Sequence, residues 1–266
     1  MSLSLFRRAQ FRFWRYAEPR AIFEWQSFYA LKPLLKRLPK GDGHAVVVFP
    51  GFGGSDRSTK PMRKLLSDLG YRSYGWGLGT NLIFDDHLEA EMVALVREVA
   101  DETGGKVSLV GWSLGGLFAR EVAKACPDVV RNVISLGSPI SGRTRHSNAH
   151  RLFQAINGKP SDLEYTRRLS LSTAPPVPTT SIYSKTDGIV AWEGSIQAES
   201  DLAESIQVPA SHLGIGVNPL AMYILADRLR QTDMAWRKFS FSGLRKIIFA
   251  KPPANVAVAN DGARAH

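Results

Sequence analysis

A serine between glycines, at the point where a buried strand gives way to a helix, constrains this chain more than any other feature. Ser113 stands in the sequence Gly111-Trp112-Ser113-Leu114-Gly115-Gly116, after an apolar run and before a helical pattern. Larger side chains two positions from the serine would collide with the neighbouring strand or helix, so glycine is needed at Gly111 and Gly115. The pattern predicts a strained turn, the nucleophile elbow, which lifts the Ser113 hydroxyl off the end of a sheet.

The context of this pattern carries more weight than the pattern itself. Glycine frequency alone produces Gly-x-Ser-x-Gly in roughly one chain in ten of this length. Here an apolar strand precedes the motif, Gly116 extends it, and the helix after it has an apolar face. That face consists of Leu117, Phe118, Val122 and Ala123. These features favour the elbow over a structural serine in a glycine-rich turn.

Strand-like and helix-like patterns alternate between residues 41 and 230. Apolar runs of strand length are the stretch before Ser113 and residues 45–49, 71–75, 129–136, 179–183 and 205–208. Helical spacing of apolar residues is found at 61–69, 85–103, from the elbow to 125, and at 217–229. This alternation predicts an α/β fold with a doubly wound, mostly parallel sheet. Residues 141–178 interrupt it with helical patterns at 148–156 and 162–169, and we expect them to form a small helical lid.

The charge distribution divides the chain into three parts. The net charge is +10, and residues 1–40 carry nine Lys or Arg against two acidic residues. Residues 231–266 carry six against two, so residues 41–230 are close to neutral. We expect residues 41–230 to form the catalytic domain. Residues 1–40 are then a basic, aromatic-rich N-terminal extension, and residues 231–266 a basic C-terminal extension and tail.

Three residues have the types and order of a catalytic triad. A serine hydroxyl is a poor nucleophile unless a base accepts its proton and a third group orients that base. In a fold with this elbow, the acid and then the histidine follow the serine along the chain. Asp187 comes directly after a predicted core strand, and His212 lies between the last predicted strand and the last predicted helix. We therefore expect Ser113, Asp187 and His212 to act together; the competing bases, His146 and His150, lie in the predicted lid.

Acyl transfer also requires backbone N–H groups that stabilise the oxyanion as it forms. The residue after the nucleophile, Leu114, supplies one of them. The glycine-rich loop after the first core strand, residues 49–55, is expected to supply the other through Phe52. No nucleotide-binding glycine motif follows this loop, which argues against a phosphate site there.

Taken together, these residues resemble the α/β-hydrolase superfamily, in particular its lipase and esterase branch. The resemblance covers roughly residues 43–230 and implies the family's roles for the triad and the two oxyanion donors. Its most specific parts are the elbow, Pro50-Gly51-Phe52, Leu136-Gly137-Ser138-Pro139, and the order of Asp187 and His212. Many members have histidine at the position of Pro50, whereas proline is similar to some phospholipases and acyltransferases. The subfamily therefore stays open.

Large apolar residues lie in the loops expected at the carboxyl ends of the strands. We expect the substrate acyl group to contact residues of this kind, namely Trp76, Trp112, Ile140 and Trp192. The alternative is that these side chains only pack the lid. The predicted lid itself carries six basic residues against two acidic ones, which either steer anionic head groups or form a solvated face.

The sequence thus predicts a serine hydrolase that cleaves carboxylic esters of apolar acyl groups, an esterase or lipase of lipid metabolism, through an acyl-enzyme on Ser113. Its substrate is a small-molecule or lipid ester, and the mechanism implies no metal and no organic cofactor. One alternative is an acyltransferase that uses the same triad. The other is a non-catalytic, membrane-associated scaffold. The acyl length, the alcohol and the oligomeric state are left undetermined.

The termini bear on location and partners. Cys126 is the single cysteine, the first thirty residues contain no uninterrupted apolar stretch, and no run has the length of a membrane span, so we expect a cytoplasmic protein. Basic and aromatic residues alternate in residues 6–16, 236–239 and 244–249. Either these aromatic residues pack on the core, or the segments contact anionic lipid at the inner membrane surface. No nucleic-acid reader motif accompanies them, so no nucleic-acid partner is expected.

Overall fold

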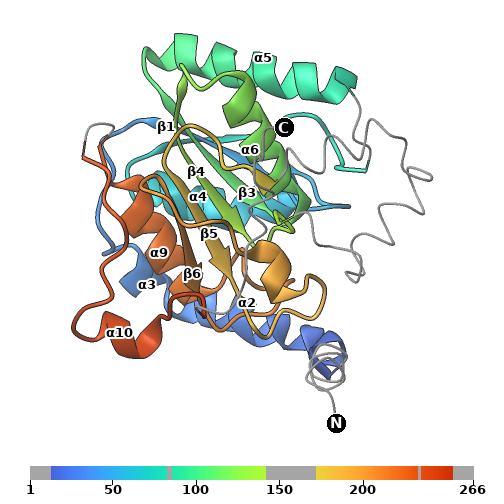
Figure 1. Ribbon diagram of the computed structural model, residues 1–266. Helices are drawn as coiled ribbons and strands as arrows, with labels where there is room; N and C mark the ends of the chain where they lie inside the picture. The colour runs from blue at the N-terminus through green and yellow to red at the C-terminus, as the bar shows by residue number, and fades with distance from the viewer. Residues whose placement is uncertain (1–12, 83–85, 142–171, 233–234, 254–266) are drawn as a thin grey trace, which may run out of the picture.

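The computed structural model describes residues 13–82, 86–141, 172–232 and 235–253. Within them, six strands form one sheet in the order β2-β1-β3-β4-β5-β6, and all neighbouring strands are parallel (Figure 1). The strands are β1 (Ala45–Phe49), β2 (Arg72–Gly75), β3 (Val107–Trp112), β4 (Val130–Leu136), β5 (Thr179–Tyr183) and β6 (Ala203–Gln207). This confirms the predicted α/β class with a parallel, doubly wound sheet.

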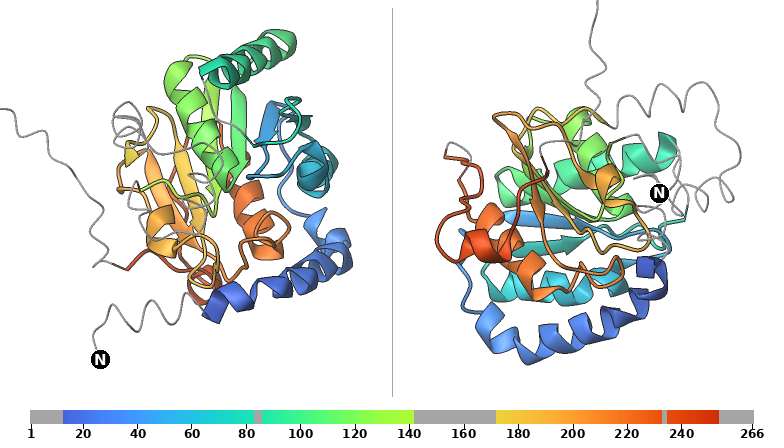
Figure 2. Two further views of the ribbon diagram at one scale, coloured as in Figure 1. Left: turned by 90° about the vertical axis from the view of Figure 1, so that its right-hand side faces the viewer. Right: turned by 60° about the horizontal axis from the view of Figure 1, so that its bottom comes forward.

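Helices cover both faces of the sheet (Figure 2). Helices α5 (Asp86–Thr103) and α6 (Leu114–Ala125) pack on one face, and the other carries α2 (Ala21–Ala30), α3 (Lys32–Leu35), α4 (Asp56–Asp68) and α9 (Pro219–Leu229). The side chains of β1 alternate between the two core clusters. Val46 and Val48 join the cluster with α4 and α9, whereas Val47 and Phe49 join the cluster with α5 and α6. Because every residue of β1 is buried on one face or the other, the strand is a continuous apolar run in the sequence.

Helix α4 begins earlier than its apolar pattern indicates. We expect this helix to start at residue 61, but it starts at Asp56, and the side chain of Ser55 caps it by accepting the N–H of Arg57 at 3.4 Å. Pro61 lies inside the helix instead of at its start. The first turn is polar, so apolar periodicity gives no sign of it, and the cap is the signal that locates the true start.

The described parts of both predicted extensions pack against the rest of the fold. Phe28 of α2 and Leu35 of α3 are buried in the core cluster that contains α4 and α9. Near the other end, Phe249 is buried in the same cluster, and Ala250 forms a backbone bridge to Gln207 at the outer edge of β6. Covering this edge shields backbone groups that would otherwise pair with a strand of another chain. Part of the aromatic content of both ends thus packs on the core.

Three short elements complete the described fold: η1 (Glu18–Arg20), η2 (Trp192–Ser195) and α10 (Arg245–Ile248). No helix in the described ranges combines the length and the apolar character needed to cross a bilayer. Of the predicted lid, only residues 141 and 172–178 are described. The helical patterns at 148–156 and 162–169, and with them His146 and His150, lie outside the described residues.

Candidate active site

Ser113 occupies the turn between β3 and α6. Its φ of 54° makes it the one non-glycine residue with a positive φ in the described part of the chain. A Cβ on Gly111 would collide with the backbone of Gly115, and a Cβ on Gly115 would collide with the carbonyl of Phe49 in β1. The Ser113 N–H donates to the carbonyl of Leu136 in β4 at 2.8 Å. Packing and a hydrogen bond therefore hold the strained serine in the elbow conformation.

The structure brings the three predicted triad side chains together at the carboxyl ends of the strands. Nε2 of His212 lies 2.9 Å from Oγ of Ser113, and Nδ1 lies 2.7 Å from Oδ2 of Asp187. The other oxygen of Asp187 accepts the N–H groups of Ile189 at 2.8 Å and Val190 at 2.7 Å. An ionised carboxylate only accepts hydrogen bonds, so Nδ1 carries the imidazole proton and Nε2 is free to accept one from the serine.

The electrostatic surroundings of His212 favour its protonated form. Burial acts to lower its pKa, because a charged imidazolium loses its hydration. The charge and hydrogen bond of Asp187, together with the charge of Glu18, outweigh burial and place the pKa above its ordinary value of 6.5. A base with this pKa accepts a proton readily and can return it to a leaving group near neutral pH.

The loop after β1 runs beside Ser113. A Cβ on Gly51 would lie 3.3 Å from Cβ of Ser113. The predicted oxyanion donors, Phe52 and Leu114, follow Gly51 and Ser113 directly in the chain. Among the described residues, no acceptor is paired with the N–H of either one. The geometry is thus compatible with the role predicted for them, which stays a prediction.

A comparison with protein families identifies the chain. Residues 20–263 match the model of the alpha/beta hydrolase family. The chain belongs to this family. The chain is also 35% identical over 104 residues to a pimeloyl-[acyl-carrier protein] methyl ester esterase of Aliivibrio salmonicida. That match covers 37% of this chain and 38% of the relative, so it compares only part of each protein.

Solved structures of lipolytic enzymes share the fold of this chain. A structure of the metagenome-derived lipolytic enzymes LipS and LipT gives a TM-score of 0.56 at 17% identity, over 73% of this chain and 96% of that one. Lipase B of Aspergillus fumigatus gives a TM-score of 0.55 at 19% identity, over 71% of this chain and 53% of the lipase chain. The mature lipase BlEst2 of Bacillus licheniformis gives a TM-score of 0.51 at 18% identity, over 73% of this chain and 95% of the lipase chain. Because the identities are below 20%, these structures show a shared fold and nothing further.

A buried asparagine that no sequence pattern indicated braces the loop after β1. The side chain of Asn81 donates to the carbonyl of Pro50 at 2.8 Å. Its backbone carbonyl accepts the N–H of Gly53 at 2.7 Å, and its N–H donates to the carbonyl of Gly54 at 2.8 Å. No motif marks Asn81, because its role depends on a loop about thirty positions earlier in the chain.

The four residues predicted to contact substrate have packing roles in the structure. Trp76 is 1% exposed in the core cluster beneath α5, and its indole N–H donates to a loop carbonyl at 2.9 Å. Ile140 is buried. Trp112 donates its indole N–H to the carbonyl of His212 at 3.0 Å, and Trp192 stacks on a tyrosine of β5. Packing accounts for the position of each, and contact with substrate stays a prediction.

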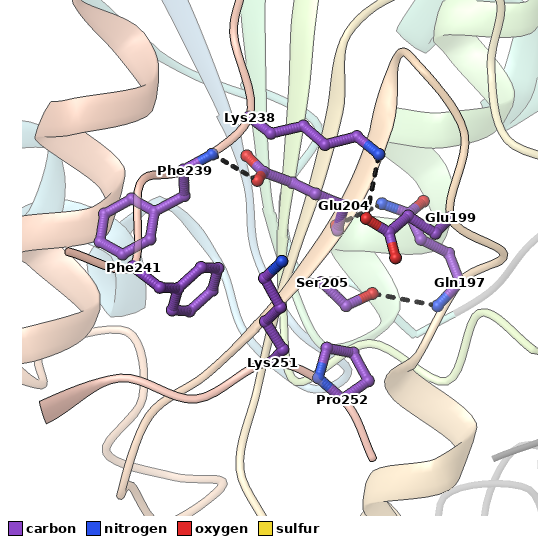
Figure 3. Close-up of a pocket in the computed structure, with 9 residues that line it drawn as sticks. All are labelled: Gln197, Glu199, Glu204, Ser205, Lys238, Phe239, Phe241, Lys251 and Pro252. Atoms are coloured by element: carbon purple, nitrogen blue, oxygen red, sulfur yellow. Dashed lines mark hydrogen bonds and ion pairs between the residues drawn. The ribbon is translucent and has the colours of Figure 1, made fainter. Parts of the chain in front are cut away.

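A small cavity of about 50 Å³ lies near the amino-terminal end of β6, where it lacks the chemistry of the triad (Figure 3). It is lined by Gln197, Glu199, Glu204, Ser205, Lys238, Phe239, Phe241, Lys251 and Pro252. Several of its polar groups are paired with one another: Ser205 accepts the N–H of Gln197 at 3.2 Å, and Glu204 accepts that of Phe239 at 2.7 Å. No histidine stands beside a nucleophile in this lining, so the elbow remains the candidate active site.

Proposed function

We propose that this hydrolase cleaves carboxylic esters of apolar acyl groups through an acyl-enzyme on Ser113. The observation that carries the proposal is the continuous hydrogen-bonded chain from Ser113 through His212 to Asp187. The name of the 35% identical relative, a methyl ester esterase, supports the ester as the bond that is cleaved. The lipolytic enzymes with the same fold support an apolar acyl group.

The proposed mechanism uses each triad atom in the position described. Nε2 of His212 accepts the hydroxyl proton of Ser113 while Oγ attacks the ester carbonyl. Asp187 stabilises the imidazolium, and the N–H groups of Phe52 and Leu114 stabilise the oxyanion. His212 then donates its proton to the departing alcohol. Water, deprotonated by His212, attacks the acyl-enzyme and releases the acid and the free serine.

Labelling with a fluorophosphonate tests the nucleophile directly. This probe phosphonylates an activated serine and releases fluoride, so we expect one label per chain, on the peptide that contains Ser113. Turnover of p-nitrophenyl esters of graded chain length then defines the acyl group. An unlabelled protein that also fails to hydrolyse any of these esters would leave a non-catalytic scaffold as the better interpretation.

The alternative acyltransferase differs from the esterase only in the group that attacks the acyl-enzyme. Products formed with water alone are compared with those formed when an alcohol or a thiol is also present. Release of free acid as the main product in both mixtures supports the esterase. Predominant transfer to the added acceptor contradicts it and identifies an acyltransferase.

We also propose that the hydrolase contacts anionic lipid at the inner membrane surface through an exposed face of α2 and α3. This α2–α3 face consists of Ile22, Phe23, Tyr29, Leu31 and Leu34, and its two most exposed side chains are Ile22 at 62% and Phe23 at 68%. Between residues 21 and 35, no exposed side chain is charged. A helix with apolar residues on its outer as well as its inner side is typical of one that another apolar phase covers.

The charges around this face match an anionic membrane. Exposed cations stand before it at Arg15 and after it at Lys36, Arg37 and Lys40. Each cation held near an anionic lipid surface contributes about 1 kcal/mol. The two helices run along one outer edge of the molecule, so the whole α2–α3 face can meet a flat surface (Figure 2).

Replacing Ile22 and Phe23 by serine should reduce sedimentation with phosphatidylglycerol-containing vesicles by at least about tenfold, because two apolar side chains that would insert into the membrane interface are lost. The matched control replaces two exposed apolar residues outside this face, Leu82 and Leu202, by serine. Deleting residues 1–40 is a poor test because Phe28 and Leu35 belong to the core. Equal sedimentation of the variant and the wild type contradicts the proposal. A dimer that disappears in the variant would identify a second copy as the occupant instead.

A further inference from the structure

The segment around η1 reaches both catalytic loops with one carboxylate. Oε1 of Glu18 accepts the N–H of Gly188 at 2.8 Å and the N–H of His212 at 3.0 Å. Oε2 accepts the N–H of Leu213 at 3.0 Å. Gly188 follows Asp187 directly, so one side chain joins the backbone of the acid loop to the backbone of the base loop. Glu18 is 5% exposed, and the low dielectric around it strengthens these bonds.

Two further charged residues of the same segment bind the same loops. Arg20 donates to the carbonyls of Thr186 and Ala210, one from each loop. Glu24 accepts the N–H of Ser211 at 2.6 Å and its hydroxyl at 3.1 Å. We call Glu18, Arg20 and Glu24 the N-terminal clamp. All its bonds to the loops fall within three residues of Asp187 or His212.

Two glycines in the catalytic loops are explained by this contact. A Cβ on Gly188 would collide with the backbone carbonyl of Trp14, and a Cβ on Gly214 would collide with the carboxylate of Glu24. Neither glycine has a positive φ, so close approach of the N-terminal segment, and not turn geometry, requires them. The loops therefore carry side-chain-free positions where the segment packs onto them.

We propose that Glu18 is a positioning residue of the triad, which fixes the spacing of the Asp187 and His212 loops and favours the imidazolium that forms during catalysis. This inference rests on the proposed function. Glu18 touches neither substrate nor the reacting atoms; it acts through the amide of His212 and through its charge. The charge contributes to the raised pKa of His212, in the same direction as Asp187.

Other charged groups near His212 must be separated from Glu18 in any pH measurement. Among the described residues, these are Asp187 from the loop after β5, and Arg20 and Glu24 from the clamp. Burial raises the pKa of Glu24 against the opposing hydrogen bonds from Ser211. Glu24 can therefore titrate in the acidic range, and a variant that removes this titration is needed as a control.

The test is Glu18→Gln, read out by the rate of fluorophosphonate labelling of Ser113 against pH. Glutamine keeps one oxygen for Gly188 and His212, but its NH₂ group then confronts the N–H of Leu213. We expect the labelling rate to fall about tenfold, as when a charged buried hydrogen bond is lost. Loss of the negative charge lowers the pKa of His212, so the acidic limb of the pH profile, in which the labelling rate rises with pH, moves to lower pH.

Glu24→Gln is the matched control, since it removes a carboxylate of the same clamp that binds Ser211 instead of His212. We expect its acidic limb to stay near that of the wild type. The proposal is overturned if the Glu18→Gln protein folds, labels at the wild-type rate and has the same acidic limb in its pH profile as the wild type. Should Glu18→Gln fail to fold, Glu18→Asp decides: a lower rate with an unmoved limb supports the proposal, and a wild-type rate overturns it. A wild-type protein that does not label at all contradicts the proposed function itself.

Discussion

Replacing Ser113 by alanine should lower kcat/KM for a p-nitrophenyl ester by at least about 10³-fold, because the members of a triad fail together when the nucleophile is lost. Fluorophosphonate labelling should disappear at the same time. The fold should survive, since alanine has the same Cβ as serine and the elbow is held by glycines and by the bond from the Ser113 N–H to Leu136. Steady-state kinetics measure the loss of activity, and a thermal unfolding curve of the same preparation checks that the fold survives.

Ser135 supplies the control for this substitution. It is a fully buried serine of β4 whose hydroxyl has no hydrogen-bond partner among the described residues. Ser135→Ala should keep wild-type turnover. If Ser113→Ala retained a tenth or more of the wild-type activity, a nucleophile other than Ser113 would have to be sought.

The sheet and the convergence of Ser113, Asp187 and His212 could be predicted from the sequence because their signals are local. A strand buried on both faces is an unbroken apolar run, as in 45–49, and the elbow concentrates its steric demands in six consecutive residues. Parallel topology then brings the carboxyl ends of all strands to one edge, so residues after different strands converge there. The positions of Asp187 and His212 after core strands are therefore enough to predict them as partners of Ser113.

The N-terminal clamp could not be predicted from local sequence patterns. Glu18 and His212 are 194 positions apart, and nothing near Glu18 distinguishes it from an exposed carboxylate on a basic segment. The surplus of cations in residues 1–40 predicts an extension outside the domain. Net charge describes the solvated side chains, however, and Phe28 and Leu35 on the opposite side of the same helices enter the core. A carboxylate that satisfies three backbone N–H groups is visible only in the folded structure.

Gly188 shows how little a local pattern says about why a position lacks a side chain. An aspartate followed by glycine predicts a tight turn, in which glycine supplies a positive φ. Gly188 has no positive φ, and the neighbour that excludes a side chain is the carbonyl of Trp14. Sequence patterns thus indicate that a side chain is absent for a reason, while the identity of the approaching atom depends on tertiary contacts.

Asp187→Asn should cost about 10³- to 10⁴-fold in kcat/KM near neutral pH. The geometry determines how the asparagine sits: Oδ1 keeps the N–H groups of Ile189 and Val190, so the NH₂ group takes the position of Oδ2 beside His212. An amide NH₂ donates to Nδ1 and forces the imidazole proton onto Nε2. That nitrogen then faces Ser113 as a donor and cannot accept the hydroxyl proton.

The pH profile separates this tautomer effect from a simple loss of structure. In the wild type, activity should rise with pH through the pKa of His212, which lies above 6.5, because only the neutral imidazole acts as a base. Removing the charge of Asp187 lowers that pKa, so any acidic limb that remains in Asp187→Asn should lie at lower pH. Asp56→Asn is the control: Asp56 also accepts two backbone N–H groups, those of Trp76 and Gly77, but bonds to no histidine in the part of the chain that the structure describes. The prediction is contradicted if both variants lose activity equally and neither pH profile shifts. Asp187 would then only stabilise its own loop, and the orientation of His212 would have to come from the contacts with Glu18.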